Sequence, residues 1–213
     1  MRVDNVREFV HNKLVELLEV TDILNTIDED EVLEIENGVN FLKIVSMFTS
    51  QKKAPWIEKY LISKLKAEKV KSSLGKGDFL YEGTYYELKT TFSTDSVNMR
   101  QVRLWQNVDY MIFVVDEQDP ENSILFKLTH DELVAEFDAL GVSYMHGVES
   151  VNKSSEFTEL SFTLKRNSEH FNRWITEYRA SDLENIILGK KESLETIEDI
   201  EVSEPVCVSE LIR

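Results

Sequence analysis

Hydrophobic side chains recur at helical spacing in several parts of the chain. Apolar residues that stand three or four positions apart give a helix one buried face. Phe41, Ile44, Val45 and Phe48 follow this spacing. The pattern predicts helices over residues 5–20, around 41–48, from Pro55 to about 65, over 96–106, over 129–140 and around 171–178.

Two local signals place helix ends. Pro55 suits the first turn of a helix, where the missing backbone N–H has no partner to lose. Thr129 and Glu132 have the spacing of a capping box, in which each side chain accepts a hydrogen bond from the backbone of the other. Gly141 suits the end of the helix that this box opens.

The period changes between residues 77 and 92, where aromatic residues and threonines flank Glu82-Gly83. This predicts a β-hairpin with a two-residue turn. Residues 110–115 (YMIFVV) are continuously apolar and predict a strand that is covered on both faces. Further strands are expected at 123–128 and 159–164. The order of elements predicts an α/β fold, a mixed central β-sheet flanked by helices, with an N-terminal helical segment.

The hairpin brings three charged residues together. Counting back from the turn places Asp78 opposite Glu87, with their Cβ atoms about 4.5–5.5 Å apart. Lys89 lies two residues further along and therefore on the same face as Glu87. Opposed carboxylates repel, and Mg²⁺ would relieve that repulsion because it prefers oxygen ligands. A Glu-x-Lys triplet alone also fits an exposed strand with a surface ion pair, and the position of Asp78 favours the functional interpretation.

Flanking residues extend this candidate site. Glu58 borders the apolar stripe of its helix, where a carboxylate is costly unless it is paired or binds something, although it could also bend to solvent. Arg100 and Arg103 share one face of the helix predicted over 96–106 and could contact phosphates, although a solvated face explains them equally. Gln101 on the inner side of that helix and Lys76 before the hairpin complete the candidate DNA contacts.

Several motifs together resemble those of the PD-(D/E)xK nucleases. The likeness is closest to type II restriction endonucleases and their phage-borne or defence-associated relatives, and it covers about residues 55–128. In this family the first acid and the acid of the ExK triplet bind Mg²⁺, for which Mn²⁺ can substitute, and the lysine assists the attacking water. The matching features are a helical acid (Glu58), Gly77-Asp78, Glu87-Leu88-Lys89, and the strand YMIFVV after a further helix.

The resemblance implies a role for each matching residue. Asp78 and Glu87 would bind the metal, with Leu88 counted in the metal site. Lys89 would act on the water, and Glu58 would be a supplementary acid. Gly77 stands where the name motif has proline. The spacing of Gln106 and Tyr110 matches the QxxxY pattern of the exonuclease branch, which we interpret as chance because it straddles a helix end and a strand start.

The charge distribution modifies this picture. The chain has 213 residues and a net charge of −16, which by itself disfavours a nucleic-acid partner. Residues 37–110 nevertheless hold 12 Lys/Arg against 7 Asp/Glu, a net of +5, whereas residues 1–36, 111–190 and 191–213 carry −8, −8 and −5. The basic third of the chain thus coincides with the candidate site. Residues 143–147 and Lys165-Arg166 could contact bases or phosphates, although a loop and a strand end also explain them.

Composition narrows the class of protein. Cys207 is the only cysteine, which excludes a disulfide framework and a cysteine-rich zinc site. No apolar run approaches the roughly 20 residues of a membrane span, and the N-terminus has no export signal, so we expect a cytoplasmic protein without a membrane partner. We expect a nuclease domain over 1–190, with a helical part over 1–50 and a catalytic core over 55–128. An acidic, disordered tail over 191–213 would follow.

The sequence therefore predicts a Mg²⁺-dependent endonuclease that hydrolyses DNA, of the restriction, defence or phage-associated kind. Homodimerisation is expected because two sites must address two strands. One alternative is an acidic DNA mimic that inhibits DNA-binding proteins, which the net charge favours. Another is an RNA-cleaving member of the same superfamily, although residues 54–77 lack the helical histidine usual there. A third is a structural protein with a degenerate nuclease fold.

Overall fold

A computed structural model describes residues 33, 35, 37–93, 95–146 and 158–190. The helix predicted over 5–20 and the tail predicted over 191–213 lie outside these residues. Among the described helices, none combines the length and the apolar character needed to cross a membrane.

The main sheet has five strands in the order β1-β2-β3-β5-β6. β3 and β5 run parallel, and the other neighbours run antiparallel. The prediction of an α/β fold with a mixed sheet is therefore confirmed, together with the strands expected at the hairpin, at 110–115 and at 123–128. The strands are β1 (Glu68–Lys69), β2 (Phe79–Tyr81), β3 (Thr84–Phe92), β5 (Asp109–Val115) and β6 (Ile124–Leu128).

A second sheet contains β4 (Ser96–Val102), β8 (Glu159–Lys165) and β7 (Ser143–His146), in the order β4-β8-β7. The strand predicted at 159–164 is confirmed. The helix predicted over 96–106 is wrong, because this segment forms β4 and then a short 3₁₀ helix, η2 (Leu104–Gln106). The interpretation of residues 143–147 as a loop is also wrong for the backbone of 143–146.

A β-bulge explains the error at β4. The register shifts between Met99 and Val102, and Gln101 has a positive φ of 54°. The extra residue lets Val97, Met99 and Val102 all be buried, although their spacing in the sequence is not strictly alternating. The resulting pattern of apolar positions imitates that of a helix.

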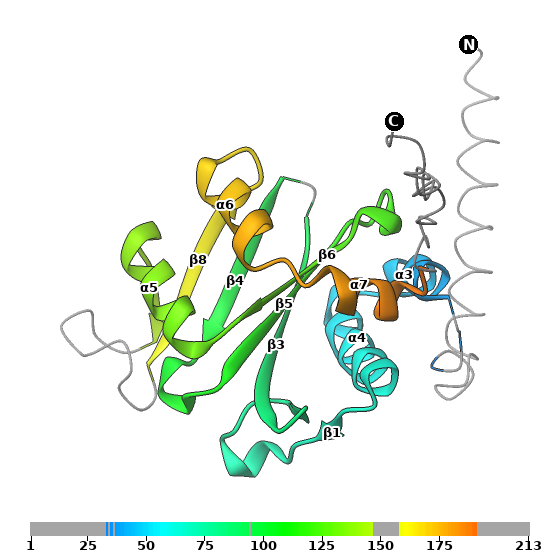
Figure 1. Ribbon diagram of the computed structural model, residues 1–213, viewed down its shortest axis with the longest axis horizontal. Helices are drawn as coiled ribbons and strands as arrows, with labels where there is room; N and C mark the ends of the chain where they lie inside the picture. The colour runs from blue at the N-terminus through cyan, green and yellow to red at the C-terminus, as the bar shows by residue number, and fades with distance from the viewer. Residues whose placement is uncertain (1–32, 34, 36, 94, 147–157, 191–213) are drawn as a thin grey trace, which may run out of the picture.

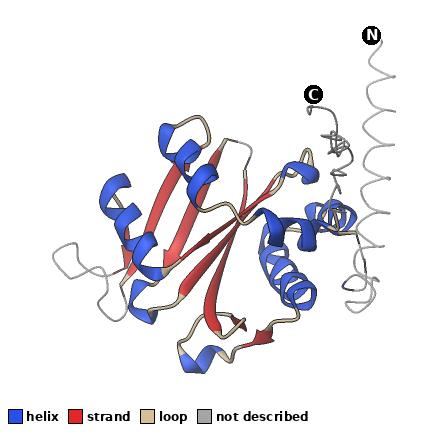
Figure 2. Ribbon diagram, viewed as in Figure 1, coloured by secondary structure: helices blue, strands red, loops and turns tan. Residues whose placement is uncertain are grey.

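Helices and the second sheet cover opposite faces of the main sheet (Figures 1 and 2). β5 takes part in both layers, as the unbroken apolar run predicts. Met111, Phe113 and Val115 belong to the core under the helices, whereas alternate residues such as Ile112 belong to the core under the second sheet. On one side lie α3 (Gly38–Ser46), α4 (Ser50–Leu65) and α7 (Ser181–Leu188), and on the other α5 (His130–Leu140) and α6 (Glu169–Glu177).

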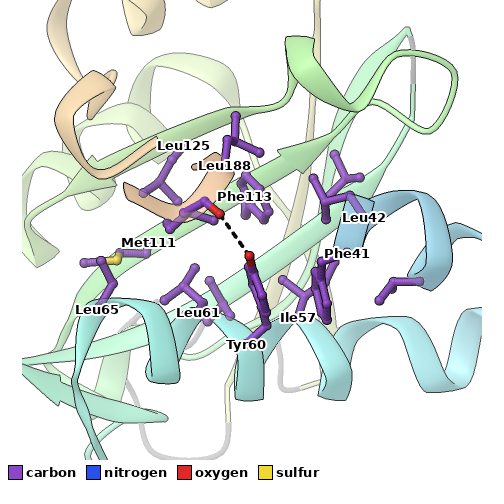
Figure 3. Close-up of a cluster of buried hydrophobic side chains, with 14 of the residues drawn as sticks. Phe41, Leu42, Ile57, Tyr60, Leu61, Leu65, Met111, Phe113, Leu125 and Leu188 are labelled. Carbon is purple, nitrogen blue, oxygen red and sulfur yellow. Dashed lines mark hydrogen bonds between the residues drawn. The ribbon is translucent and has the colours of Figure 1, made fainter. Parts of the chain in front are cut away.

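The core under α4 is built around Tyr60, whose ring stacks on Phe41 at 3.7 Å between ring centroids (Figure 3). Its hydroxyl donates to the backbone oxygen of Ile187 at 3.4 Å, which joins α4 to α7. α4 begins at Ser50, so the prediction that Pro55 lies in the first turn is wrong by about one turn. An interior proline costs about 3 kcal/mol. Burial of Ile57, Tyr60 and neighbouring side chains outweighs it at about 1.5–3 kcal/mol for each large apolar group.

The helices predicted over 129–140 and around 171–178 are confirmed as α5 and α6. α5 opens with the predicted capping box, in which Thr129 accepts from the N–H of Glu132 and Glu132 accepts from the N–H of Thr129. Gly141 follows its last residue. α6 buries Phe171 and Trp174 on the predicted apolar stripe.

Candidate functional site

The hairpin has the predicted register from Phe79 to Tyr81 and from Thr84 to Tyr86, but the predicted pair of Asp78 with Glu87 is not part of the ladder. Tyr81 pairs with Thr84 and Phe79 pairs with Tyr86, across a turn made by Glu82 and Gly83. Both turn residues have positive φ, 49° and 81°, as the two-residue turn that matches strand twist requires. The register fixes which residues of β3 lie next to the chain that enters β2.

Asp78 lies just before β2 and is fixed at the edge of β3. Its N–H donates to the backbone oxygen of Tyr86 at 2.8 Å, and its Oδ2 accepts from the N–H of Leu88 at 2.8 Å. In an extended strand the N–H and C=O of one residue point to the same side. The backbone oxygen of Leu88 therefore faces the edge where the Asp78 carboxylate lies.

Gly77 makes this approach possible. Its φ is +73°, and a Cβ at this position would lie 2.5 Å from the backbone oxygen of Tyr86. Any side chain would force the two segments apart. Gly77 is thus required at this position.

Glu87 and Lys89 lie on the opposite face of β3 from Tyr86 and Leu88, which pack under the helices. Glu87 is 5% exposed, and its Oε1 lies 2.6 Å from Nζ of Lys89. The alternative of an exposed strand with a surface ion pair is therefore wrong. Removing such a pair from water costs several kcal/mol per ion, so these charges do not contribute to stability in a simple way.

The electrostatics of Asp78 record how close the charged groups lie. Burial, together with the charges of Glu87 and Glu58, raises the pKa of Asp78 to about 6, against the opposing effects of the Leu88 N–H and of Lys89. Negative charge is therefore concentrated here at a cost in free energy. A bound cation would relieve that cost.

Glu58 and Asp78 line the same cavity, which has a volume of about 470 Å³. Oε1 of Glu58 lies 3.1 Å from Nζ of Lys69, and its side chain is 26% exposed. The prediction that Glu58 faces the site is consistent with this position, although its direct partner is a lysine. The other lining residues are Val70, Lys71, Ser72 and Gly77.

The predicted DNA contacts on β4 are not arranged as expected. Arg100 and Arg103 do not share a helix face, because the segment is a bulged strand. Arg103 is paired with Glu159, with 2.8 Å between Nε and Oε1. Gln101 is exposed at the bulge instead of lying on an inner face. Lys76 lies beside the hairpin, with its Nζ 4.9 Å from the centre of the Tyr85 ring.

Tyr110 is a neighbour of the site that the sequence analysis placed only in an apolar run and in a chance match to the QxxxY pattern. In the parallel register of β3 and β5 it is the partner of Glu87. Burial raises the pKa of the Tyr110 hydroxyl, and the charge of Glu87 raises it further. This contact follows from the parallel pairing of β3 with β5. Counting positions along one strand does not predict that pairing.

Other buried carboxylates have different surroundings. Glu136 accepts hydrogen bonds from Arg173, from Trp174 at 2.9 Å and from Tyr178 at 3.0 Å. Glu184 accepts from the N–H of Leu125 at 2.9 Å and is bound in a bidentate manner by Arg179. Multiple donors satisfy both groups, so we interpret them as structural links between elements.

The oxygen atoms at the site suit a particular kind of metal. Within the described residues, no three or more His, Cys, Asp or Glu side chains form a group that could hold an ion by themselves. Asp78, Glu87 and the Leu88 carbonyl offer oxygen ligands only, and Asp78 lines an open cavity. Mg²⁺ is commonly bound through one or two carboxylates while it keeps several waters. The residues present fit Mg²⁺ on these terms and do not fit zinc.

Comparison with protein-family models, curated proteins and solved structures finds no match to this chain. Function is therefore argued from the geometry of the site.

Proposed function

We propose that this protein is a Mg²⁺-dependent endonuclease that hydrolyses phosphodiester bonds in DNA, in the manner of restriction or defence enzymes. One observation carries the proposal. At one end of β3, the Asp78 carboxylate is fixed on the N–H of Leu88 while the buried Glu87–Lys89 pair occupies the adjacent face. Asp78 lines an open cavity, and Glu87 and Lys89 lie close enough for their charges to act on the pKa of its carboxylate.

Each residue has a distinct part in this proposal. Asp78, Glu87 and the carbonyl of Leu88 would hold Mg²⁺, which when bound supplies positive charge that polarises a phosphate. The Leu88 N–H keeps the Asp78 carboxylate oriented, so that little reorganisation is needed. Lys89 has only donors, and it would orient the attacking water and stabilise charge that develops on the phosphate oxygens. The Asp78 and Glu87 carboxylates would supply no donors of their own while ionised.

The acidic-mimic alternative receives less support from these positions. A mimic presents carboxylates to its partner across an exposed surface, whereas Glu87 is 5% exposed. Double-strand cleavage would require two sites, so a homodimer is part of the proposal.

Incubation of supercoiled plasmid with purified protein and Mg²⁺ tests the proposal. We expect nicked and linear products that EDTA abolishes, and mapping of the ends would define the cut. Intact plasmid at all Mg²⁺ and Mn²⁺ concentrations would count against nuclease activity.

A further inference from the structure

The cavity beside Asp78 has a basic wall. β1, the 3₁₀ helix η1 (Ser72–Leu74) and the residues next to them form this wall, which we define as residues 66–76. Residues 66–76 include four lysines and one glutamate, a net of +3 in a chain of net −16. Lys69, Lys71 and Ser72 all line the cavity. Positive charge therefore gathers where the candidate site opens.

Lys69 can change partner at little cost. Its Nζ lies 3.1 Å from Oε1 of Glu58, and its side chain is 63% exposed. Exposed ion pairs contribute about 0–1 kcal/mol. A phosphate group in the cavity would offer Lys69 an alternative anionic partner that accepts charge-assisted hydrogen bonds. Lys71 and Ser72 are both exposed, so both side chains are accessible to a ligand in the cavity. The Ser72 hydroxyl can donate a hydrogen bond to it.

A second cavity, of about 560 Å³, is the competing location for an anion. Lys165 and Arg166 line it, but Asp95 lines it too, and Asp116 lies 3.6 Å from Arg166. This second cavity adjoins Ser96, the first residue of β4, and Lys165, the last residue of β8. It therefore lies at the opposite end of the β4–β8 pair from Val102 and Leu160. Acids offset cations in the lining of both cavities, but no candidate metal ligand lines this one, whereas residues 66–76 beside the first cavity carry a net charge of +3.

We propose that the basic wall binds the phosphate backbone of the DNA strand that is cut, with Lys71 and Ser72 in contact with phosphate and Lys69 exchanging Glu58 for phosphate. The identity of the ligand as DNA rests on the proposed function. The location of the contacts rests on the cavity and on its charges. The proposed DNA-binding surface thereby lies on the segment between α4 and the hairpin, which contains the predicted contact Lys76, and not on β4, where the other predicted contacts lie.

DNA affinity measured without turnover tests this inference. Fluorescence anisotropy of a labelled duplex oligonucleotide in EDTA, repeated over a series of salt concentrations, gives both affinity and its salt dependence. The variants are Lys71→Gln and the double variant Lys69→Gln/Lys71→Gln. Lys43→Gln, an exposed lysine on α3, is the charge-matched control, and Lys165→Gln tests the second cavity.

We expect the slope of log affinity against log salt to fall by about 0.9 for each lost phosphate contact. The fall should therefore be close to twice as large in the double variant as in Lys71→Gln, with no change in the control. Ser72→Ala should weaken binding and leave the slope unchanged, because a hydroxyl carries no charge. Circular dichroism should match the wild type throughout, since both lysines are exposed.

Several results would overturn the inference. These are an unchanged slope in the double variant, a larger loss in Lys165→Gln, or no measurable DNA binding at low salt. Lysine-dependent binding without any Mg²⁺-dependent cleavage would uphold the basic wall and refute the nuclease. Cleavage with lysine-independent binding would do the reverse, so the two failures are distinguishable.

Discussion

Oδ2 of Asp78 accepts a 2.8 Å hydrogen bond from the backbone N–H of Leu88. This bond uses a donor that β2 does not reach, because the ladder between β2 and β3 ends at Tyr86. A single side chain therefore caps the open edge of β3 and places a carboxylate next to the Leu88 carbonyl. The Asp78 carboxylate therefore satisfies the backbone N–H of Leu88 and also forms part of the candidate site.

Asp78→Asn should stabilise the metal-free protein at neutral pH. The folded-state pKa is raised to about 6 from 3.8, so protonation stabilises the folded state fully below about pH 4, and this stability is lost as pH rises through 6. Asparagine keeps an oxygen acceptor for Leu88 and carries no charge. We expect a gain of about 3 kcal/mol at pH 8, since one pKa unit corresponds to 1.36 kcal/mol.

Urea unfolding in EDTA at pH 4 and pH 8 measures this difference. The gain should disappear at pH 4, where both proteins are neutral at this position. A variant that is less stable than the wild type at pH 8 would show that the charge of Asp78 is not costly.

Lys89→Met should separate stability from chemistry. Loss of one partner from a buried ion pair costs about 3–5 kcal/mol, because Glu87 is left uncompensated. Mg²⁺ should then raise the melting temperature of the variant more than that of the wild type, since the ion replaces the lysine as counter-charge. The rate of cleavage should fall by about 10²–10³. Equal effects of Mg²⁺ on the two melting temperatures would contradict the assignment of Glu87 as a metal ligand.

Gly77→Ala and Gly83→Ala form a matched pair in the same hairpin. Both glycines have positive φ, so each variant carries backbone strain of about 1–2 kcal/mol. Only at Gly77 does the new Cβ meet another atom, 2.5 Å from the Tyr86 oxygen, whereas at Gly83 nothing lies within 4 Å. We expect Gly77→Ala to be the less stable in urea and to lose Mg²⁺-dependent cleavage. Comparable loss in both variants would mean that the close approach at Gly77 is unimportant.

The local parts of the site could be predicted from the sequence, and the tertiary parts could not. The hairpin register follows from counting away from the turn, so the proximity of Asp78, Glu87 and Lys89 was accessible. Tyr110 pairs with Glu87 only because β3 and β5 are parallel neighbours, which no local pattern states.

The error at β4 has a similar origin. The bulge at Gln101 disguises the period of two, and the second sheet that buries Val97 and Met99 is formed with strands more than forty residues later in the chain. Arg103 was expected to contact phosphates because it shares a predicted helix face with Arg100, but its observed partner is Glu159, 56 residues later in the chain. The two arginines on a predicted helix face therefore did not reveal which groups they contact.

Cleavage of supercoiled plasmid by three proteins tests the central claim most directly. The proteins are the wild type, Asp78→Asn, and Asp182→Asn, which changes an exposed carboxylate on α7. The account predicts equal Mg²⁺-dependent rates for the wild type and Asp182→Asn, a rate lower by at least about 10² for Asp78→Asn, and no cleavage in EDTA. Wild-type rates in Asp78→Asn, or cleavage that persists in EDTA, would contradict the claim that Asp78 and Glu87 form a metal-dependent catalytic site.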